Sequence, residues 1–236
     1  MERSVIILAG GFGTRLQGVV KDLPKPMAPV NGKPFLSYLL DYLVDYGCTK
    51  AVLSVGYLHE KIQDFFGNSY KSIAIDYAVE AEPLGTGGAI AFAMQKCHRD
   101  NVLVLNGDTM FRADLAAFEA FHHSKGGLFS MVLRQMPDVS RYGNVLTDSN
   151  DRITLFAEKN TATGEGFING GIYMINKRLF AKHPMPQKFS FEKDLMEKVF
   201  DTEPLFGYKS DAYFIDIGIP EDYARAQKEL KNISFY

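Results

Sequence analysis

The sequence has few of the features that mark secreted or membrane-spanning proteins. Its 236 residues include only two cysteines, Cys48 and Cys97, which lie far apart and without the spacing of metal ligands. Neither a disulfide framework nor a zinc site is predicted, which is typical of a reducing compartment. No apolar run approaches the roughly 20 residues of a membrane-spanning helix, and the first apolar run is too short for a signal peptide. We expect a cytoplasmic protein without a membrane partner.

Charge of one sign is also lacking. The 26 Lys and Arg residues nearly balance the 28 Asp and Glu residues, the net charge is -2, and no basic block interrupts the chain. Nucleic-acid binding relies on a broad positive surface, so we expect no nucleic-acid partner. Any anionic ligand must therefore be held by a local site.

The first half of the chain alternates apolar runs with helical patterns. Buried strands are predicted at 5–8, 51–55, 73–79 and 102–108, and helices between them at 34–47, 59–67 and 87–96. This alternation implies crossover connections and a mostly parallel sheet. In the second half, strands at 128–136, 143–150, 153–160 and 170–175 follow one another through turns and predict an antiparallel extension. A helix at 190–200, with Ser190 as its N-cap, and a strand, turn and helix at 212–230 complete the chain.

The first predicted strand leads directly into a glycine-rich loop, in the stretch "VIILAGGFGTRLQGVVKDLPKPM". Glycines after a strand let backbone N–H groups approach and cradle a phosphate. Arg15 adds a fork that matches phosphate oxygens, and Lys25, held between Pro24 and Pro26, adds a compact second cation. The Walker loop and the dinucleotide fingerprint are both absent. The loop therefore predicts a phosphate site of another kind, with an ordinary glycine turn as the alternative.

Two further strands share one design, because each ends in an aspartate. "VLVLNGD" ends at Asp108, and "AYFIDIG" carries Asp216. Two carboxylates at strand ends can hold Mg²⁺, which takes the rest of its shell from water and phosphate. The alternative is that both aspartates only stabilise turns.

These motifs together resemble the sugar-phosphate nucleotidyltransferases, whose signature is G-G-x-G-T-R-L followed by P-K-P. The resemblance runs nearly end to end. It implies an α/β protein with a Rossmann-like α/β/α sandwich, whose central sheet is mixed and mostly parallel and carries a small antiparallel extension. It also implies a single nucleotidyltransferase domain at 1–236, with a nucleotide-binding half at 1–110 and a sugar-phosphate-binding half at 111–236.

The resemblance further implies the residues of the nucleotide site. Arg15, Lys25 and Asp108 would be catalytic, and Asp108 and Asp216 would bind Mg²⁺ as the cofactor. The residues expected to bind the nucleotide are Leu8, Ala9, Gly10, Gly11, Gly13, Thr14, Arg15, Lys25, Glu80, Pro83, Gly85, Thr86, Asn106, Gly107 and Asp108.

The identity of the base depends on Glu80, in the stretch "YAVEAEPLGTGGA". Family members that use thymidine or uridine triphosphate often carry glutamine here, whereas this loop resembles the guanylyltransferase version. Guanine presents two adjacent N–H donors, and a carboxylate can accept both, whereas an amide accepts at only one end. Gly85 would let the backbone come close to the base. The alternative is a solvated glutamate at a strand end.

Three clusters in the second half resemble the family's sugar pocket. They are "RYGNV" at 141–145, "AEKN" at 157–160 and "INGGIYMI" at 168–175. The sugar-phosphate residues that they imply are Tyr142, Gly143, Glu158, Lys159, Asn169 and Gly170. For Glu158 and Lys159 the alternative is a weak surface ion pair.

The resemblance implies that GTP and a sugar 1-phosphate are the partners and leaves a homo-oligomer open. The compact chain is most similar to guanylyltransferases that act on D-glycero-α-D-manno-heptose 1-phosphate for surface polysaccharide. Mannose 1-phosphate guanylyltransferases and enzymes that use UTP or dTTP are neighbouring alternatives, and a non-catalytic subunit that binds nucleotide sugars is a third. An NAD-dependent oxidoreductase is disfavoured by the missing fingerprint.

Overall fold

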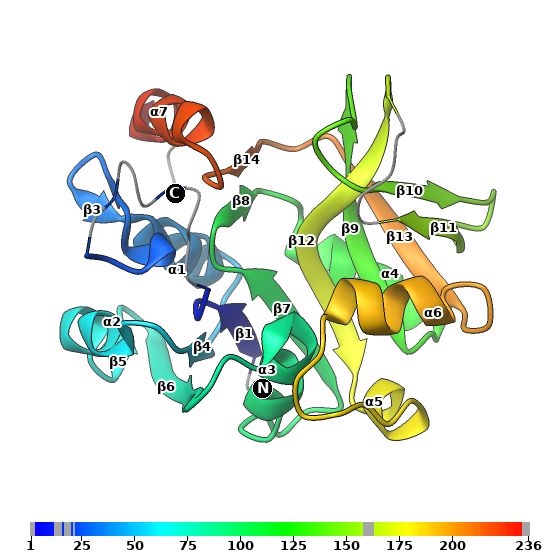
Figure 1. The fold of residues 1–236 in the computed structure, drawn as a ribbon, viewed down its shortest axis with the longest axis horizontal. Coiled ribbons are helices and arrows are strands. Elements are labelled where there is room, and N and C mark those ends of the chain that lie inside the picture. The colour runs from blue at the N-terminus through cyan, green and yellow to red at the C-terminus, as the bar shows by residue number, and fades with distance from the viewer. Residues whose placement is uncertain (1–2, 12–15, 17–19, 21, 158–162, 233–236) are drawn as a thin grey trace.

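The computed structural model of the chain describes residues 3–11, 16, 20, 22–157 and 163–232. Its centre is a ten-stranded sheet in which β11, β10, β12, β7, β1, β4, β6 and β5 lie in that order, with β9 and β13 joined to it through β12. Figure 1 shows this sheet passing from cyan β6 to orange β13. The strands of this sheet are β1 (Ser4–Leu8), β4 (Lys50–Val55), β5 (Ser69–Tyr70), β6 (Ile73–Val79), β7 (Asn101–Asn106), β9 (Phe129–Met136), β10 (Asn144–Thr147), β11 (Ile153–Ala157), β12 (Gly166–Asn176) and β13 (Leu205–Ser210). Two small antiparallel sheets pair β2 (Pro29–Val30) with β3 (Lys33–Pro34), and β8 (Thr109–Phe111) with β14 (Phe214–Asp216).

Four strands of the first half, β1, β4, β6 and β7, run parallel and end at one edge of the sheet. β1 lies between β4 and β7, so that Leu8 has Ser54 and Asn106 as its neighbours in register. β6 continues the parallel set beyond β4. The four predicted strands and their order of alternation with helices are confirmed. Because parallel strands present their carboxyl ends together, this edge is where ligands of such sheets bind.

The second half joins the sheet in antiparallel fashion through β12. This strand pairs with β7 and β10 on one side and with β9 on the other. The sequence patterns did not predict β13, which joins this extension and runs parallel to β9. β9 lies between β12 and β13. It runs antiparallel to β12 and parallel to β13, so β13 also runs opposite to β12.

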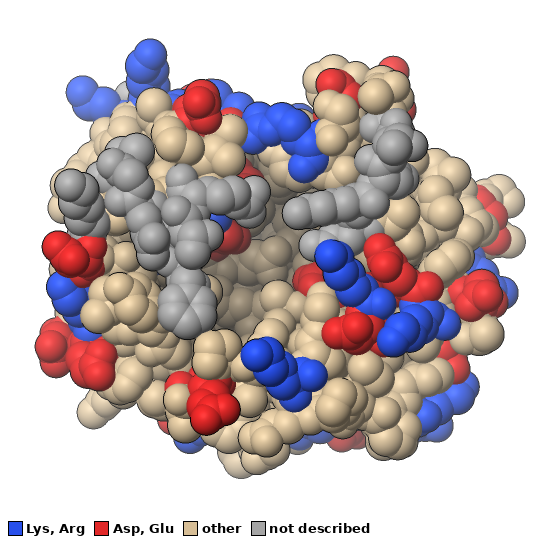
Figure 2. Space-filling model, in the orientation of Figure 1, with Lys and Arg blue, Asp and Glu red and all other residues tan. Residues whose placement is uncertain are grey.

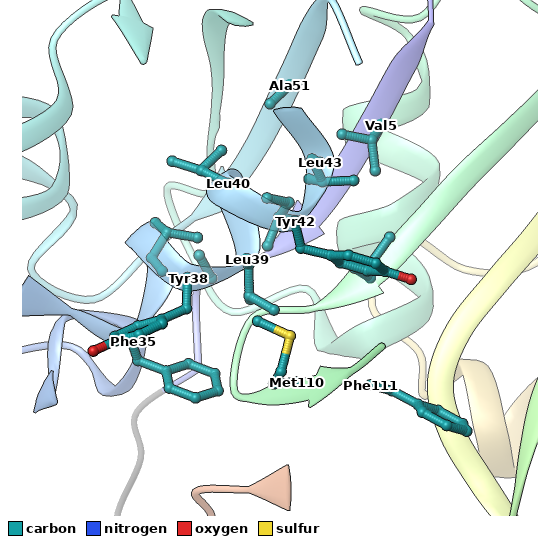
Figure 3. Close-up of a cluster of buried hydrophobic side chains, with 14 of the residues drawn as sticks. Val5, Phe35, Tyr38, Leu39, Leu40, Tyr42, Leu43, Ala51, Met110 and Phe111 are labelled. Carbon is teal, nitrogen blue, oxygen red and sulfur yellow. The ribbon is translucent and has the colours of Figure 1, made fainter. Parts of the chain in front are cut away.

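Helices cover both faces of the sheet because apolar side chains point alternately to either side of its strands. In β1, Val5 and Ile7 join one core and Ile6 joins the other. Figure 3 shows the first core, where Tyr42 and Leu43 of α1 gather with Val5 of β1. None of the helices in the described part of the chain combines the length and apolar character needed to cross a bilayer. The helices are α1 (Phe35–Asp45), α2 (His59–Phe66), α3 (Gly85–Met94), α4 (Leu115–Lys125), α5 (Arg178–Lys182), α6 (Glu197–Val199) and α7 (Pro220–Glu229), with the short turns η2 (Lys25–Met27), η3 (Phe191–Met196) and η4 (Leu230–Asn232).

Helix α4 lies outside the predicted helices, although both of its ends carry recognisable signals. The Asp114 carboxylate accepts a hydrogen bond from the Ala117 N–H at 2.9 Å, as an N-cap does, and Gly126 ends the helix at φ 63°. Its apolar face is narrow, with Leu115 and Phe118 as its buried apolar residues. The periodicity that identifies a helix is therefore weak here. The predicted helix at 190–200 is confirmed, with Ser190 as N-cap, and it opens with a π-helical turn.

Candidate functional site

A cleft of about 420 Å³ opens at the carboxyl ends of β1, β4 and β7. Figure 2 shows the molecule hollowed near the centre of this face. The residues that line the cleft belong to these strand ends and to segments that follow them in the chain. Its lining residues are Leu8, Gly10, Gly11, Lys25, Pro26, Ser54, Glu80, Pro83, Gly85, Thr86, Ala89, Asn106, Asp108 and Gly218.

Most of the residues predicted to bind the nucleotide meet in this cleft. Those that line it are Leu8, Gly10, Gly11, Lys25, Glu80, Pro83, Gly85, Thr86, Asn106 and Asp108. Ala9 and Gly107 lie beneath it instead, where the Ala9 N–H donates to the Ser54 carbonyl and the Gly107 N–H donates to the Leu8 carbonyl. The predicted residues Gly13, Thr14 and Arg15 lie outside the described residues. The sequence reasoning did not identify four lining residues: Pro26, Ser54, Ala89 and Gly218.

Lys25 lies between the two predicted metal-binding aspartates. Its ammonium nitrogen is 2.5 Å from Asp108 Oδ2 and 3.6 Å from Asp216 Oδ1. The two carboxylates meet because the β8–β14 ladder pairs Asp216 with Thr109. Desolvation in the cleft would raise the pKa of Asp108, but the Lys25 cation and the Thr109 hydroxyl outweigh it and lower that pKa. Asp108 therefore stays ionised in the folded protein.

The pair Asp108 and Asp216 fits a hard dication in the chemistry of its donors. Both side chains are partly exposed, at 35% and 28%, and both approach the same cation, that of Lys25. Asp108 lines the cleft, whereas Asp216 is not among its lining residues. The described residues hold no cluster of three or more His, Cys, Asp or Glu side chains suited to a metal. Two carboxylates without a third protein ligand suit Mg²⁺ bound together with substrate phosphates, rather than a closed metal cage.

Glu80 presents its carboxylate to the cleft with both oxygens already held. The Ser54 hydroxyl donates to Oε1 and the Leu84 N–H donates to Oε2, each at 3.1 Å. The backbone N–H of Glu80 donates to the Val55 carbonyl at 2.8 Å. Gly10 faces this carboxylate, and a Cβ there would come within 3.0 Å of Oε1. The arrangement leaves one face of the carboxylate for a ligand with adjacent N–H donors.

The glycines that open α3 are required by a neighbouring segment. A Cβ at Gly85 would meet the Phe189 carbonyl oxygen at 2.5 Å, and one at Gly87 would overlap the Phe189 ring. The N–H groups of Gly87 and Gly88 donate to that same carbonyl. The Thr86 hydroxyl donates to Glu192 at 2.6 Å. At the start of α3, the N–H groups of Gly87 and Gly88 are therefore already bonded to the segment at Phe189.

The described members of the group predicted to hold the sugar phosphate are not among the residues that line the cleft: Tyr142, Gly143, Asn169 and Gly170. Asn169 donates from Nδ2 to the Tyr173 hydroxyl at 2.8 Å and accepts at Oδ1 from the Gly171 N–H at 2.9 Å. Beside it, a Cβ at Gly170 would meet the Phe111 ring.

Two of the other predicted sugar-phosphate residues, Tyr142 and Gly143, lie in the loop before β10. The ring centroid of Tyr142 is 6.5 Å from that of Phe214, the first residue of β14. Gly143, the residue after Tyr142, is half-buried. Glu158 and Lys159 lie outside the described residues. The role of this group in sugar binding stays a prediction.

Comparisons with known proteins point the same way as this geometry. The nucleotidyl transferase family matches residues 4–233. A D-glycero-alpha-D-manno-heptose 1-phosphate guanylyltransferase of Aneurinibacillus thermoaerophilus is 49% identical, with 96% of this chain and 98% of that protein aligned. One from Campylobacter jejuni is 44% identical, over 92% and 96% of the two chains. The crystal structure of HddC from Yersinia pseudotuberculosis complexed with GMP-PN superimposes with a TM-score of 0.85 at 38% identity, covering 97% of this chain and 99% of that one. With nearly the whole chain matched, this protein belongs to the nucleotidyl transferase family.

Proposed function

We propose that this protein transfers a guanylyl group from GTP to D-glycero-α-D-manno-heptose 1-phosphate, releasing pyrophosphate and forming the GDP-sugar. The observation that carries the proposal is the cleft, which Lys25, Asp108 and Glu80 line at the strand ends. Asp216 lies beside it, 3.6 Å from the Lys25 ammonium. The relative that is 49% identical is a guanylyltransferase for this sugar phosphate, which supports the choice of both substrates.

The proposed chemistry needs alignment and charge neutralisation more than acid or base catalysis. An oxygen of the sugar phosphate forms a bond to the α-phosphorus of GTP, while the bond between that phosphorus and the bridging oxygen to the β-phosphate breaks. A phosphate monoester is mostly dianionic at neutral pH, with a second pKa of about 6, so no base is needed to activate it. Lys25 would neutralise the charge that builds on the departing pyrophosphate, and we propose that Arg15 assists it. Mg²⁺, when bound by Asp108 and Asp216, supplies further positive charge against the phosphate oxygens.

We assign the incoming sugar phosphate to the second half of the chain. Its position would bring the phosphate into line opposite the pyrophosphate, because in-line displacement requires entry and departure on opposite sides. The residues that we propose for this role are Tyr142, Gly143, Glu158, Lys159, Asn169 and Gly170.

The proposal is tested by a matrix of substrates. The protein is incubated with GTP, ATP, UTP or dTTP and with a panel of sugar 1-phosphates, in the presence of Mg²⁺, and the pyrophosphate released is measured. We expect the highest kcat/KM with GTP and the heptose 1-phosphate. A preference for mannose 1-phosphate, or for UTP or dTTP, would favour a neighbouring activity of the family. No pyrophosphate with any pair, despite nucleotide binding, would favour a non-catalytic binding subunit.

Replacement of Glu80 by glutamine tests the assignment of the base. We expect kcat/KM for GTP to fall about 10- to 100-fold, because one end of the amide donates where guanine also donates. Glu82→Gln is the matched control, since Glu82 is exposed two residues away and does not line the cleft. Kinetics with the four triphosphates provide the measurement. Unchanged discrimination in the Glu80 variant would remove this residue from base recognition.

Gly11→Ala separates ligand binding from stability. A Cβ at Gly11 meets no described atom within 4 Å, whereas one at Gly10 would crowd Glu80. We therefore expect Tm to stay constant or rise slightly. The KM for GTP should rise about tenfold, because the methyl group intrudes where phosphate oxygens approach the backbone. An unaltered KM for GTP would show that phosphate does not approach this part of the loop.

A further inference from the structure

The hydroxyl of Ser54 is a buried polar group within an apolar strand. Ser54 is the fifth residue of β4 and has no exposed surface. Leu53 and Val55 on either side of it are equally buried. A hydroxyl taken out of water destabilises the fold unless it finds a hydrogen-bond partner. Ser54 finds that partner in Glu80, because its oxygen lies 3.1 Å from Oε1 and the serine donates the proton.

This hydrogen bond is one of two that fix the orientation of the Glu80 carboxylate. The other comes from the Leu84 N–H to Oε2, on the opposite side of the carboxyl group. One donor on each oxygen opposes rotation about the last side-chain bond of the glutamate. Each carboxylate oxygen has two lone pairs, so each can still accept one further proton. The carboxylate is thus held in one plane with an acceptor available on both oxygens.

We propose that Ser54 is a positioning residue for base selectivity, acting through Glu80. It holds the carboxylate in the plane in which its two oxygens meet the two adjacent N–H donors of guanine. The Leu84 N–H is backbone and is present with any side chain, whereas the hydroxyl of Ser54 depends on the residue type. This inference rests on the proposed use of GTP and adds the side chain that makes the glutamate selective.

The test compares GTP with ITP, whose base lacks the N2 amino group, and with UTP. In Ser54→Ala, we expect kcat/KM for GTP to fall about five- to tenfold, mostly through KM, because one hydrogen bond that orients the acceptor is lost. The values for ITP and UTP should change less, so that both selectivity ratios decrease. Ser54→Thr keeps the hydroxyl and should restore the ratios. Ser54→Cys, which is near in shape and a weak donor, should repeat the loss and serves if the alanine variant folds poorly.

A double-mutant cycle with Glu80→Gln tests whether Ser54 acts through the glutamate. We expect Ser54→Ala to have little further effect on selectivity once Glu80 is replaced. Ser130→Ala is the matched control, because Ser130 of β9 is also fully buried. Its hydroxyl is hydrogen-bonded to His122 of α4, and neither residue lines the cleft. It should leave the ratios unchanged.

Two results would overturn the inference while leaving the proposed function in place. One is unaltered selectivity in Ser54→Ala when Glu80→Gln loses it. The other is an equal loss for GTP, ITP and UTP that persists in the double variant, which would mark a purely structural role. Failure of the wild-type protein to prefer GTP would instead overturn the proposed function, and the inference with it.

Discussion

Replacing Lys25 by alanine should lower kcat about a thousandfold, as removal of a single charge-stabilising group does in comparable sites. In the structure the ammonium of this lysine lies 2.5 Å from Asp108 and 3.6 Å from Asp216. Its side chain is only 10% exposed, so bulk water compensates little for its loss. Two anions must approach each other in the proposed reaction, and the lysine offsets their repulsion as pyrophosphate departs. KM should change less than kcat, because the charge that Lys25 neutralises is greatest in the transition state.

The variant needs a control for the loss of an ion pair whose carboxylate is held inside the fold. Lys182 is suitable because its ammonium lies 2.7 Å from the buried Glu203, in a part of the molecule that does not line the cleft. Lys182→Ala should retain the wild-type kcat. Steady-state kinetics together with Tm for both variants separate catalysis from folding. A near-normal kcat for Lys25→Ala, with saturating GTP and Mg²⁺, would exclude this lysine from the reaction.

The position of the site could be predicted from the sequence because each of its main parts follows a strand. Apolar runs fix where β1 and β7 end, and the residues that follow them, Gly10 and Asp108, must then lie at one edge. The approach of Asp108 to Asp216 was harder to predict from the sequence. It depends on the β8–β14 ladder, which has only three residue pairs and joins segments about a hundred residues apart.

Other parts of the site gave no local signal. Ser54 is a single polar residue in the run "KAVLSV", and its partner Glu80 follows a different strand. Serine is common enough in strands that its spacing alone does not indicate a role. Gly85 was predicted to approach the base and does line the cleft, but an added Cβ there would also meet the Phe189 carbonyl, as Cβ atoms at Gly87 and Gly88 would meet the segment at 187–189. Contacts between residues so far apart in the sequence depend on the packing of the whole fold, and no local sequence pattern encodes them.

Gly107→Ala should lower both stability and activity, because this residue follows β7 directly and packs against the backbone at the end of β1. Its N–H donates to the Leu8 carbonyl at 2.9 Å, and an added Cβ would overlap that carbonyl oxygen and lie 3.1 Å from its carbon. Both groups are backbone within a sheet and cannot turn aside as a side chain would. We expect a loss of about 2–3 kcal/mol in the free energy of unfolding, as for overpacked cores. In a chain of this size that corresponds to a decrease in Tm of about 5–10 °C.

The same substitution should reduce kcat by more than the loss of stability explains, because Asp108 is the next residue. If the added methyl group separates β7 from β1, the Asp108 carboxylate moves relative to Lys25. A misplacement of about 1 Å can lower a rate about a hundredfold. Gly11→Ala is the matched control: it adds the same methyl group at the end of the same strand pair, where no described atom obstructs it. If Gly107→Ala matched that control in Tm and kept the wild-type kcat at a temperature where both are folded, the close approach of the two strands would have no part in placing Asp108.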